Sequence, residues 1–114
     1  MSCTALNKKY KGKNFPIDKD LTMMIPAVYV YAKDDGPTYT PIYVGQTKHV
    51  AQRLDEEQDG NGGKDYLTES KKNGANIIII FTEDMNDEQH RLDVEKELIF
   101  EWRKKGFRLL NKRL

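Results

Sequence analysis

Residues 26–32, PAVYVYA, alternate between aliphatic and tyrosine side chains, which is the pattern of a β-strand with two different faces. Val28 and Val30 share one face, and Tyr29 and Tyr31 share the other. The segment KDDGPTYTP follows, and its Asp-Gly-Pro sequence is typical of a turn. We therefore expect a strand that leads into a hairpin.

The stretch after this turn, residues 41–46 (PIYVGQ), alternates in the same way. Ile42 and Val44 share one face, whereas Tyr43 lies on the other. If the two strands form an antiparallel hairpin, their aliphatic faces coincide. Tyr29 and Tyr43 then lie together on the opposite face, either as a packed cross-strand pair or as part of a site.

The spacing of apolar residues becomes helical directly after the second strand. Thr47 can cap a helix, and Val50 and Leu54, four residues apart, would form its apolar seam. His49 and Arg53 are also four residues apart and share an adjacent face. A strand end followed by a helix start with an arginine favours an anion site, and a plain surface helix is the alternative.

The second half of the chain predicts one more strand and two helices. Residues 76–82, NIIIIFT, form a short β-branched run that is typical of a buried strand. A short helix is expected over residues 64–72, and a longer one from Asn86 to about Lys105, just before Gly106. The predicted fold class is α+β, with a small three-stranded antiparallel sheet flanked by helices.

One carboxylate falls on the apolar face of the long helix. At about 100° per residue, a stripe forms from four apolar residues: Leu92, Leu98, Ile99 and Trp102. Val94 lies at the edge of this stripe, and Glu95 falls inside it. Burying a carboxylate without a partner is costly, so Glu95 must be either paired or used. Arg91, one turn earlier, is a candidate for an ion pair.

The charge of the chain is balanced overall but unevenly distributed. Its 114 residues suit one small domain, and a net charge of +1 does not by itself indicate a nucleic-acid partner. Residues 1–24 read as a basic polar arm, ahead of a domain at residues 25–114. From Arg103 onward the chain has no acidic residue, so its two basic ends predict a basic rim; solvated surface charge is the alternative.

The composition excludes several classes of protein. The single cysteine, Cys3, rules out a disulfide framework and a cysteine-based zinc site. No segment reaches the length of a membrane span, and the N-terminus lacks the apolar core of a signal peptide. We expect a cytoplasmic protein with no membrane partner.

Five positions on these elements together resemble the signature of the GIY-YIG nuclease family. The two signature triplets read AVY at residues 27–29 and YVG at residues 43–45. The family's helix arginine, eight residues after the last glycine, corresponds to Arg53. The E-x-x-L-I of its late helix is EKELI, which begins at Glu95, and its terminal asparagine corresponds to Asn111.

Three features depart from the family pattern. Ala27 replaces the glycine of the first triplet, and its small volume is compatible with activity. Gln46 stands where many similar proteins have a lysine, so a phosphate contact is lost there or passes to Lys48 or His49. The segment GFRLL precedes Asn111, where a turn that contains proline is common.

The resemblance implies a DNA endonuclease that hydrolyses phosphodiester bonds with a divalent metal ion, Mg²⁺ or Mn²⁺. The implied catalytic residues are Tyr29, Tyr43, His49, Arg53, Glu95 and Asn111. Glu95 would bind the metal, and Arg53 would face the scissile phosphate. Tyr43 would position or deprotonate the attacking water, with Tyr29 as its partner or in the exchanged role. Asn111 would orient the site.

Further residues are expected to contact the DNA: Gln46, Lys48, Arg103, Lys104, Lys112 and Arg113. A single site cuts one strand, so double-strand cleavage would need a homodimer or two visits, and a partner protein could supply targeting. The setting would be the cytoplasm of a bacterium or a phage-infected cell. Two other functions stay open: a catalytically inactive nucleic-acid-binding module with the same fold, and a small interaction or inhibitor protein.

Overall fold

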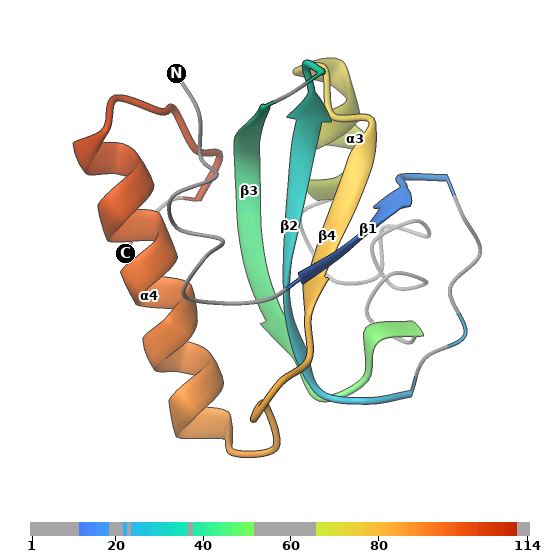
Figure 1. Ribbon diagram of the computed structural model, residues 1–114, viewed down its shortest axis with the longest axis vertical. Helices are drawn as coiled ribbons and strands as arrows, with labels where there is room; N and C mark the ends of the chain where they lie inside the picture. The colour runs from blue at the N-terminus through green and yellow to red at the C-terminus, as the bar shows by residue number, and fades with distance from the viewer. Residues whose placement is uncertain (1–11, 19–21, 23, 37, 52–65, 112–114) are drawn as a thin grey trace.

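A computed structural model describes the chain at residues 12–18, 22, 24–36, 38–51 and 66–111. Within these residues, one antiparallel sheet has the strand order β1-β4-β2-β3, and two helices pack against it (Figure 1). The elements are β1 (Gly12–Pro16), β2 (Ala27–Asp34), β3 (Tyr39–Thr47), α3 (Tyr66–Lys72), β4 (Ile77–Phe81) and α4 (Glu88–Lys104). The predicted α+β fold class is confirmed.

The expected hairpin is formed by β2 and β3. Tyr29 lies opposite Gly45 in its register, and Tyr31 lies opposite Tyr43. The turn begins where the sequence predicted it, since the Asp34 side chain accepts a hydrogen bond from the Gly36 amide at 3.0 Å. The hairpin therefore brings the tyrosines of both strands to one face.

A bulge in the hairpin overturns one detail of the prediction. The register shifts directly after the pair formed by Tyr31 and Tyr43, and Ile42 is the extra residue on β3. Ile42 packs with the tyrosines, whereas Val44 packs under α4. The expectation that Ile42 and Val44 share a face was wrong, because strict alternation does not continue across a bulge.

The three expected strands are joined by a fourth, β1. It pairs with β4, with Lys13 opposite Ile80 and Phe15 opposite Ile78. Its sequence, GKNFP, has one aromatic residue among polar and turn-forming residues, so it carries no alternation that predicts a strand. The sequence analysis places this segment in the arm at residues 1–24, and the boundary between arm and domain stays a prediction.

The sheet separates two hydrophobic clusters. The first, which we call the α4 core, contains Val28, Val30, Ala32, Val44, Ile79, Phe81, Met85, Val94, Leu98, Ile99 and Trp102. The second, which we call the tyrosine cluster, contains Ala27, Tyr29, Tyr31, Ile42, Tyr43, Val50, Leu67, Ala75, Ile78 and Ile80. Strand β4 supplies residues to both clusters, which explains why its sequence is apolar without alternation.

Helix α4 begins and ends close to the predicted residues. Asp87 caps its N-terminus, and the Asp87 carboxylate accepts a hydrogen bond from the His90 amide at 3.1 Å. Gly106 follows the last turn with a φ of 98°, in the left-handed region that favours glycine. The capping pattern of the sequence was therefore sufficient to locate this helix.

The buried face of α4 differs slightly from the predicted stripe. Its buried residues are Arg91, Val94, Leu98, Ile99 and Trp102. Leu92 is only half-buried, and Val94, expected at the edge, is 2% exposed. The burial of Arg91, also 2% exposed, was not predicted.

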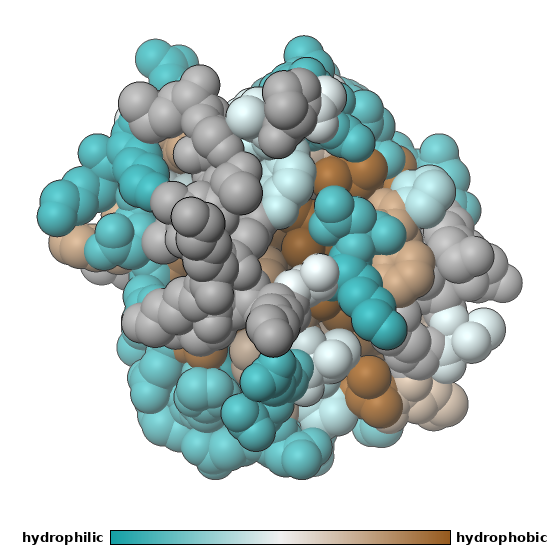
Figure 2. Space-filling view, in the orientation of Figure 1, coloured by the Kyte–Doolittle hydropathy of each residue, from teal (hydrophilic) through white to brown (hydrophobic). Residues whose placement is uncertain are grey.

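The outward surface of α4 is mostly hydrophilic, as Figure 2 shows, although Phe100 is 53% exposed. Among the described residues, no helix is both long enough and apolar enough to cross a membrane. Helix α4 is therefore stabilised mainly by the one face that it buries against the sheet.

Two substitutions on α4 test this packing. Leu98→Ala removes a fully buried side chain and is expected to lower the free energy of unfolding by about 2–5 kcal/mol. Phe100→Ala, two residues away on the exposed side, should change it by less than about 0.5 kcal/mol. Urea denaturation followed by circular dichroism measures both, and equal effects would contradict the assignment of the buried face.

Candidate active site

Three tyrosines of the hairpin form a compact group on one face of the sheet. The ring centroids of Tyr29 and Tyr31 are 5.4 Å apart, those of Tyr29 and Tyr43 are 6.3 Å apart, and those of Tyr31 and Tyr43 are 5.9 Å apart. Tyr66 of α3 stacks on Tyr43, with a centroid distance of 4.2 Å and an interplanar angle of 14°. The structure thus brings the two signature tyrosines together, as expected.

The two signature tyrosines differ in their access to solvent. Tyr29 is 1% exposed, whereas Tyr43 is 7% exposed on the edge strand β3. Stacking against Tyr66 fixes the plane of the Tyr43 ring. Of the pair, Tyr43 is therefore better placed to meet a molecule that arrives from solvent.

Gly45 is required by the position of the Tyr29 ring. The two residues are cross-strand partners, and a Cβ added to Gly45 would overlap the ring carbons and hydroxyl oxygen of Tyr29. The sequence analysis found the glycine, but not the neighbour that requires it. The glycine of the YVG triplet is therefore required for packing, because the tyrosine ring of the first triplet lies directly against it.

Asn111 is bonded to the main chain of β3 between the signature tyrosine and glycine. Its Nδ2 donates to the Val44 carbonyl at 2.7 Å, and its Oδ1 accepts from the Val44 amide at 3.0 Å. The Leu110 amide adds a bond to the Ile42 carbonyl at 2.8 Å, and Arg103 donates to the Asn111 carbonyl. The amide side chain pairs with the edge strand as another strand would.

Arg91 connects helix α4 to the end of β3. Its Nε donates to Gln46 Oε1 at 2.9 Å, and its Nη1 donates to the carbonyls of Met85 at 2.9 Å and Asn86 at 3.3 Å. The cation is almost fully buried, so these oxygen atoms replace its hydration. Gln46, expected to contact DNA, uses its side-chain oxygen inside the protein.

Glu95 is half-buried on α4, one turn after Arg91. The ion pair between these two residues that the sequence raised stays a prediction, and Arg91 donates hydrogen bonds to Gln46 and to two loop carbonyls. Helix α4 packs against β3 and β2, the strands that carry the signature triplets, on the face opposite the tyrosine cluster. Glu95 therefore lies on a helix that is fixed against both of these strands.

The junction after β3 holds His49 and Lys48. Thr47 Oγ1 accepts a hydrogen bond from the His49 amide at 3.1 Å, ahead of helical residues that begin at Val50, and most of the expected helix lies outside the described residues. His49 is half-buried, and among the described residues its Nδ1 has no hydrogen-bond partner. Lys48 is exposed and so is available to an anion.

The remaining expected residues divide into placed and unplaced ones. Lys104 is exposed on the last turn of α4, and Arg103 is half-buried by its bond to the Asn111 carbonyl. Arg53, Lys112 and Arg113 lie outside the described residues. The structure thus gathers both tyrosines and the asparagine around β3, and its described part does not include the arginine.

The donor atoms of the described residues fit a magnesium-like ion better than a zinc-like ion. In that part of the chain, no group of three or more His, Cys, Asp or Glu side chains could hold a metal. Mg²⁺ keeps several of its waters and can be held by one or two carboxylates. A single carboxylate, Glu95, is compatible with that mode of binding.

Sequence reasoning missed three residues around this site. Tyr31 shares a strand face with Tyr29, so alternation already placed its ring with the others. Tyr66 is the first residue of the short helix α3 and has no periodicity that links it to Tyr43. The burial of Arg91 depends on an acceptor 45 positions away, Gln46, and no local pattern reports that distance.

Exchange of Gly45 tests the contact with Tyr29. Gly45→Ala is expected to lower the free energy of unfolding by about 1–3 kcal/mol, because the ring must shift to admit the methyl group. Combining it with Tyr29→Leu should recover part of that loss, since the shorter side chain vacates the space. A double-mutant cycle by chemical denaturation measures the coupling, and additive effects would contradict the contact.

Comparisons with known proteins agree with this geometry. The model of the GIY-YIG catalytic domain matches residues 26–109. Similar solved structures include the GIY-YIG N-terminal endonuclease domain of UvrC from Thermotoga maritima bound to magnesium, which is 21% identical, with a TM-score of 0.54 over 74% of this chain and 84% of that chain. A point mutant of that domain is 22% identical, with the same TM-score over 90% and 93%.

The two kinds of match carry different weight. At this identity, the solved structures show a shared fold. No curated protein gives a significant match. The family match extends over most of the sequence and includes both triplets and Glu95. The chain belongs to the GIY-YIG nuclease family.

Proposed function

We propose that this protein is a divalent-metal-dependent endonuclease that hydrolyses phosphodiester bonds in DNA. The observation that carries the proposal is the arrangement around β3. Tyr43 lies beside Tyr29, and the Tyr29 ring packs on Gly45. Asn111 is hydrogen-bonded to the main chain of β3 between Tyr43 and Gly45. A plain hairpin would need none of these contacts in the positions that the family signature occupies.

The tyrosine pair would act on the attacking water. Tyr43 is the more accessible of the two, which favours it as the residue that positions or deprotonates the water. A tyrosine has an ordinary pKa of about 10, so a nearby cation is needed to stabilise its phenolate. Tyr29, packed against it, would hold that ring in place.

Cationic groups would stabilise the charge that develops on the phosphate. Arg53 carries a planar and permanently charged guanidinium, which suits the in-line transition state of a phosphodiester. The exposed Lys48 would contact the DNA backbone beside it, with Lys104 further along and His49 as a second donor. Gln46 would support this region through Arg91.

Glu95 would hold the metal ion, for which Mg²⁺ or Mn²⁺ is suited. When bound, such an ion polarises the phosphate and stabilises the leaving oxygen. The magnesium-bound structure of the similar UvrC domain supports this choice. Glu95 would carry out this role from α4, whose buried face fixes the helix against the sheet.

The same proposal bears on partners and setting. DNA would be the substrate, contacted mainly through its phosphates. Cleavage of both strands would use a homodimer or a partner protein that selects the target, because one site cuts one strand. A bacterial or phage-infected cytoplasm would supply both DNA and magnesium.

A plasmid-nicking assay tests the proposal. The wild-type protein should relax supercoiled DNA with Mg²⁺ or Mn²⁺ and lose this activity when EDTA is added. Glu95→Gln should reduce the rate at least about 100-fold, because it removes the charge that binds the ion. Asp93→Asn, on the exposed side of the same helix, is the matched control and should cut at the wild-type rate.

The result also separates the alternatives. Salt-sensitive DNA binding without cleavage under any metal would contradict the enzymatic proposal and favour a binding module of the same fold. Absence of both binding and cleavage would favour an interaction protein.

A second substitution tests the role of the tyrosines. Tyr43→Phe should lower the cleavage rate by about 10²–10⁴-fold, the range for loss of an acid–base group. Tyr31→Phe is the control within the same cluster, since its ring packs beside Tyr43 but belongs to neither triplet. Single-turnover cleavage rates compare the two, and equal losses would mean that the hydroxyl of Tyr43 has no special role.

A further inference from the structure

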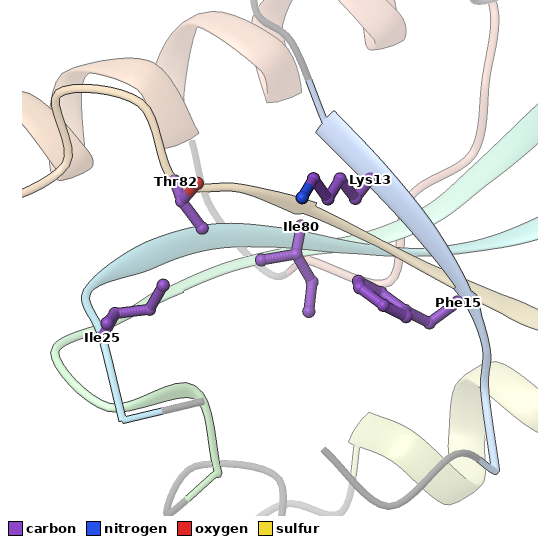
Figure 3. Close-up of a pocket in the computed structure, with 5 residues that line it drawn as sticks. All are labelled: Lys13, Phe15, Ile25, Ile80 and Thr82. Atoms are coloured by element: carbon purple, nitrogen blue, oxygen red, sulfur yellow. The ribbon is translucent and has the colours of Figure 1, made fainter. Parts of the chain in front are cut away.

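A cavity of about 320 Å³ lies beside the tyrosine cluster, where β1 meets β4 (Figure 3). Its lining residues are Lys13, Phe15, Ile25, Ile80 and Thr82. A cavity of about 150 Å³ is enough to hold benzene, so this one has room for a planar nucleobase. None of these five residues has a part in the proposed cleavage reaction.

The cavity lies on the same face of the sheet as the signature tyrosines. Lys13 pairs with Ile80 across β1 and β4, and Ile80 pairs with Tyr29 across β4 and β2. Two strand spacings of about 4.8 Å therefore separate Lys13 from Tyr29, or about 10 Å along the sheet. That distance is the rise of about three stacked nucleotides, so DNA at the tyrosines would extend to the cavity.

The cavity also connects to the junction that follows β3. The Val50 amide donates to the Ile25 carbonyl at 3.2 Å, so a wall of the cavity is bonded to the segment that carries Lys48 and His49. A strand of DNA that follows these two residues would pass from the junction to the cavity across Ile25, which is 43% exposed.

The lining combines an aromatic ring, a cation and a hydroxyl group. Figure 3 shows the Lys13 and Phe15 side chains extending from β1 toward Ile80, with Thr82 and Ile25 across from them. Phe15 is half-buried and Lys13 is exposed, so the ring is held in place while the ammonium group stays accessible. Proteins bind unpaired nucleotides with this combination, in which rings stack on bases and cations neutralise phosphates.

We propose that this cavity binds an unstacked base of the DNA substrate a few nucleotides from the cleaved bond. Phe15 stacks on the base, Lys13 neutralises the adjacent phosphate, and the Thr82 hydroxyl meets the polar edge of the base. The proposal rests on the proposed function, because it takes the occupant to be the strand that the tyrosines cut. It adds a subsite from β1, which lies outside the part of the chain that the family model matches.

Binding of two synthetic oligomers, without divalent metal, tests the stacking. One is a fluorescein-labelled oligothymidylate, and the other has the same backbone and length but no bases. The wild-type protein should bind the oligothymidylate more tightly, and Phe15→Leu should reduce that preference by about tenfold. Phe100→Leu, an equivalent change at an exposed position of α4, should leave the preference intact.

The lysine is tested separately. Lys13→Gln should weaken the binding of both oligomers equally and lower the slope of log affinity against log salt by about 0.7, the contribution of one phosphate on a single strand. Lys33→Gln is the control and should leave the slope unchanged, because Lys33 is an exposed residue near the end of β2 that is farther from Tyr29. Lys13 is exposed, so this variant tests the cavity even if Phe15→Leu impairs folding.

The outcomes distinguish this proposal from the one on which it rests. If the wild-type protein cuts and binds DNA but Lys13→Gln and a folded Phe15→Leu behave like it, the cavity proposal is wrong and the enzymatic one stands. If the wild-type protein neither binds nor cuts DNA, both proposals fail. Thermal melting of each variant confirms that it is folded.

Discussion

The contact between the Tyr29 ring and Gly45 is the constraint on which the arrangement of the site depends. It needs one hairpin register, because a shift by one residue would place a side chain against the ring. The same register places Tyr43 opposite Tyr31 and next to the ring of Tyr29. The signature triplets are thus two halves of one packing arrangement, and the proximity of the two signature tyrosines follows from it.

This arrangement lies on an edge strand, and edge strands need support. Asn111 supplies it on the open side of β3, where its amide pairs with both main-chain groups of Val44. Arg91 supplies it at the strand end through Gln46. The buried Arg91 also explains the departure at Gln46, since a lysine there would set a second cation against the guanidinium and leave it without its acceptor.

The sequence predicted the elements whose signals are local. The hairpin, β4 and α4 each had alternation, a β-branched run or capping residues, and all were found. Strand β1 was missed because GKNFP has no such signal; it is held by pairing with β4 and by the packing of Phe15 against the tyrosine cluster. The bulge at Ile42 was missed for a related reason, since alternation assumes an unbroken register.

The spacing of residues in the sequence predicted which residues form the candidate site, but not the contacts that hold them in place. The placement of Tyr29, Tyr43 and Asn111 agrees with the signature. The contacts that hold them there were not predictable from the sequence: the Tyr29 ring packs on Gly45, and the Asn111 side chain is hydrogen-bonded to the main chain of β3. The contacts of Arg91 and Tyr66 join segments far apart in sequence, where neither residue type nor period carries information.

The central claim is that a water molecule, placed by the tyrosine pair, breaks a phosphodiester bond of DNA. The most direct measurement is cleavage in water enriched in heavy oxygen, with Mg²⁺ present, followed by mass spectrometry of the DNA ends. Hydrolysis forms a new bond between phosphorus and the water oxygen and expels the sugar oxygen, which takes a proton. The account predicts one heavy oxygen atom on the new terminal phosphate; ends without the label, or DNA left joined to the protein, would contradict it.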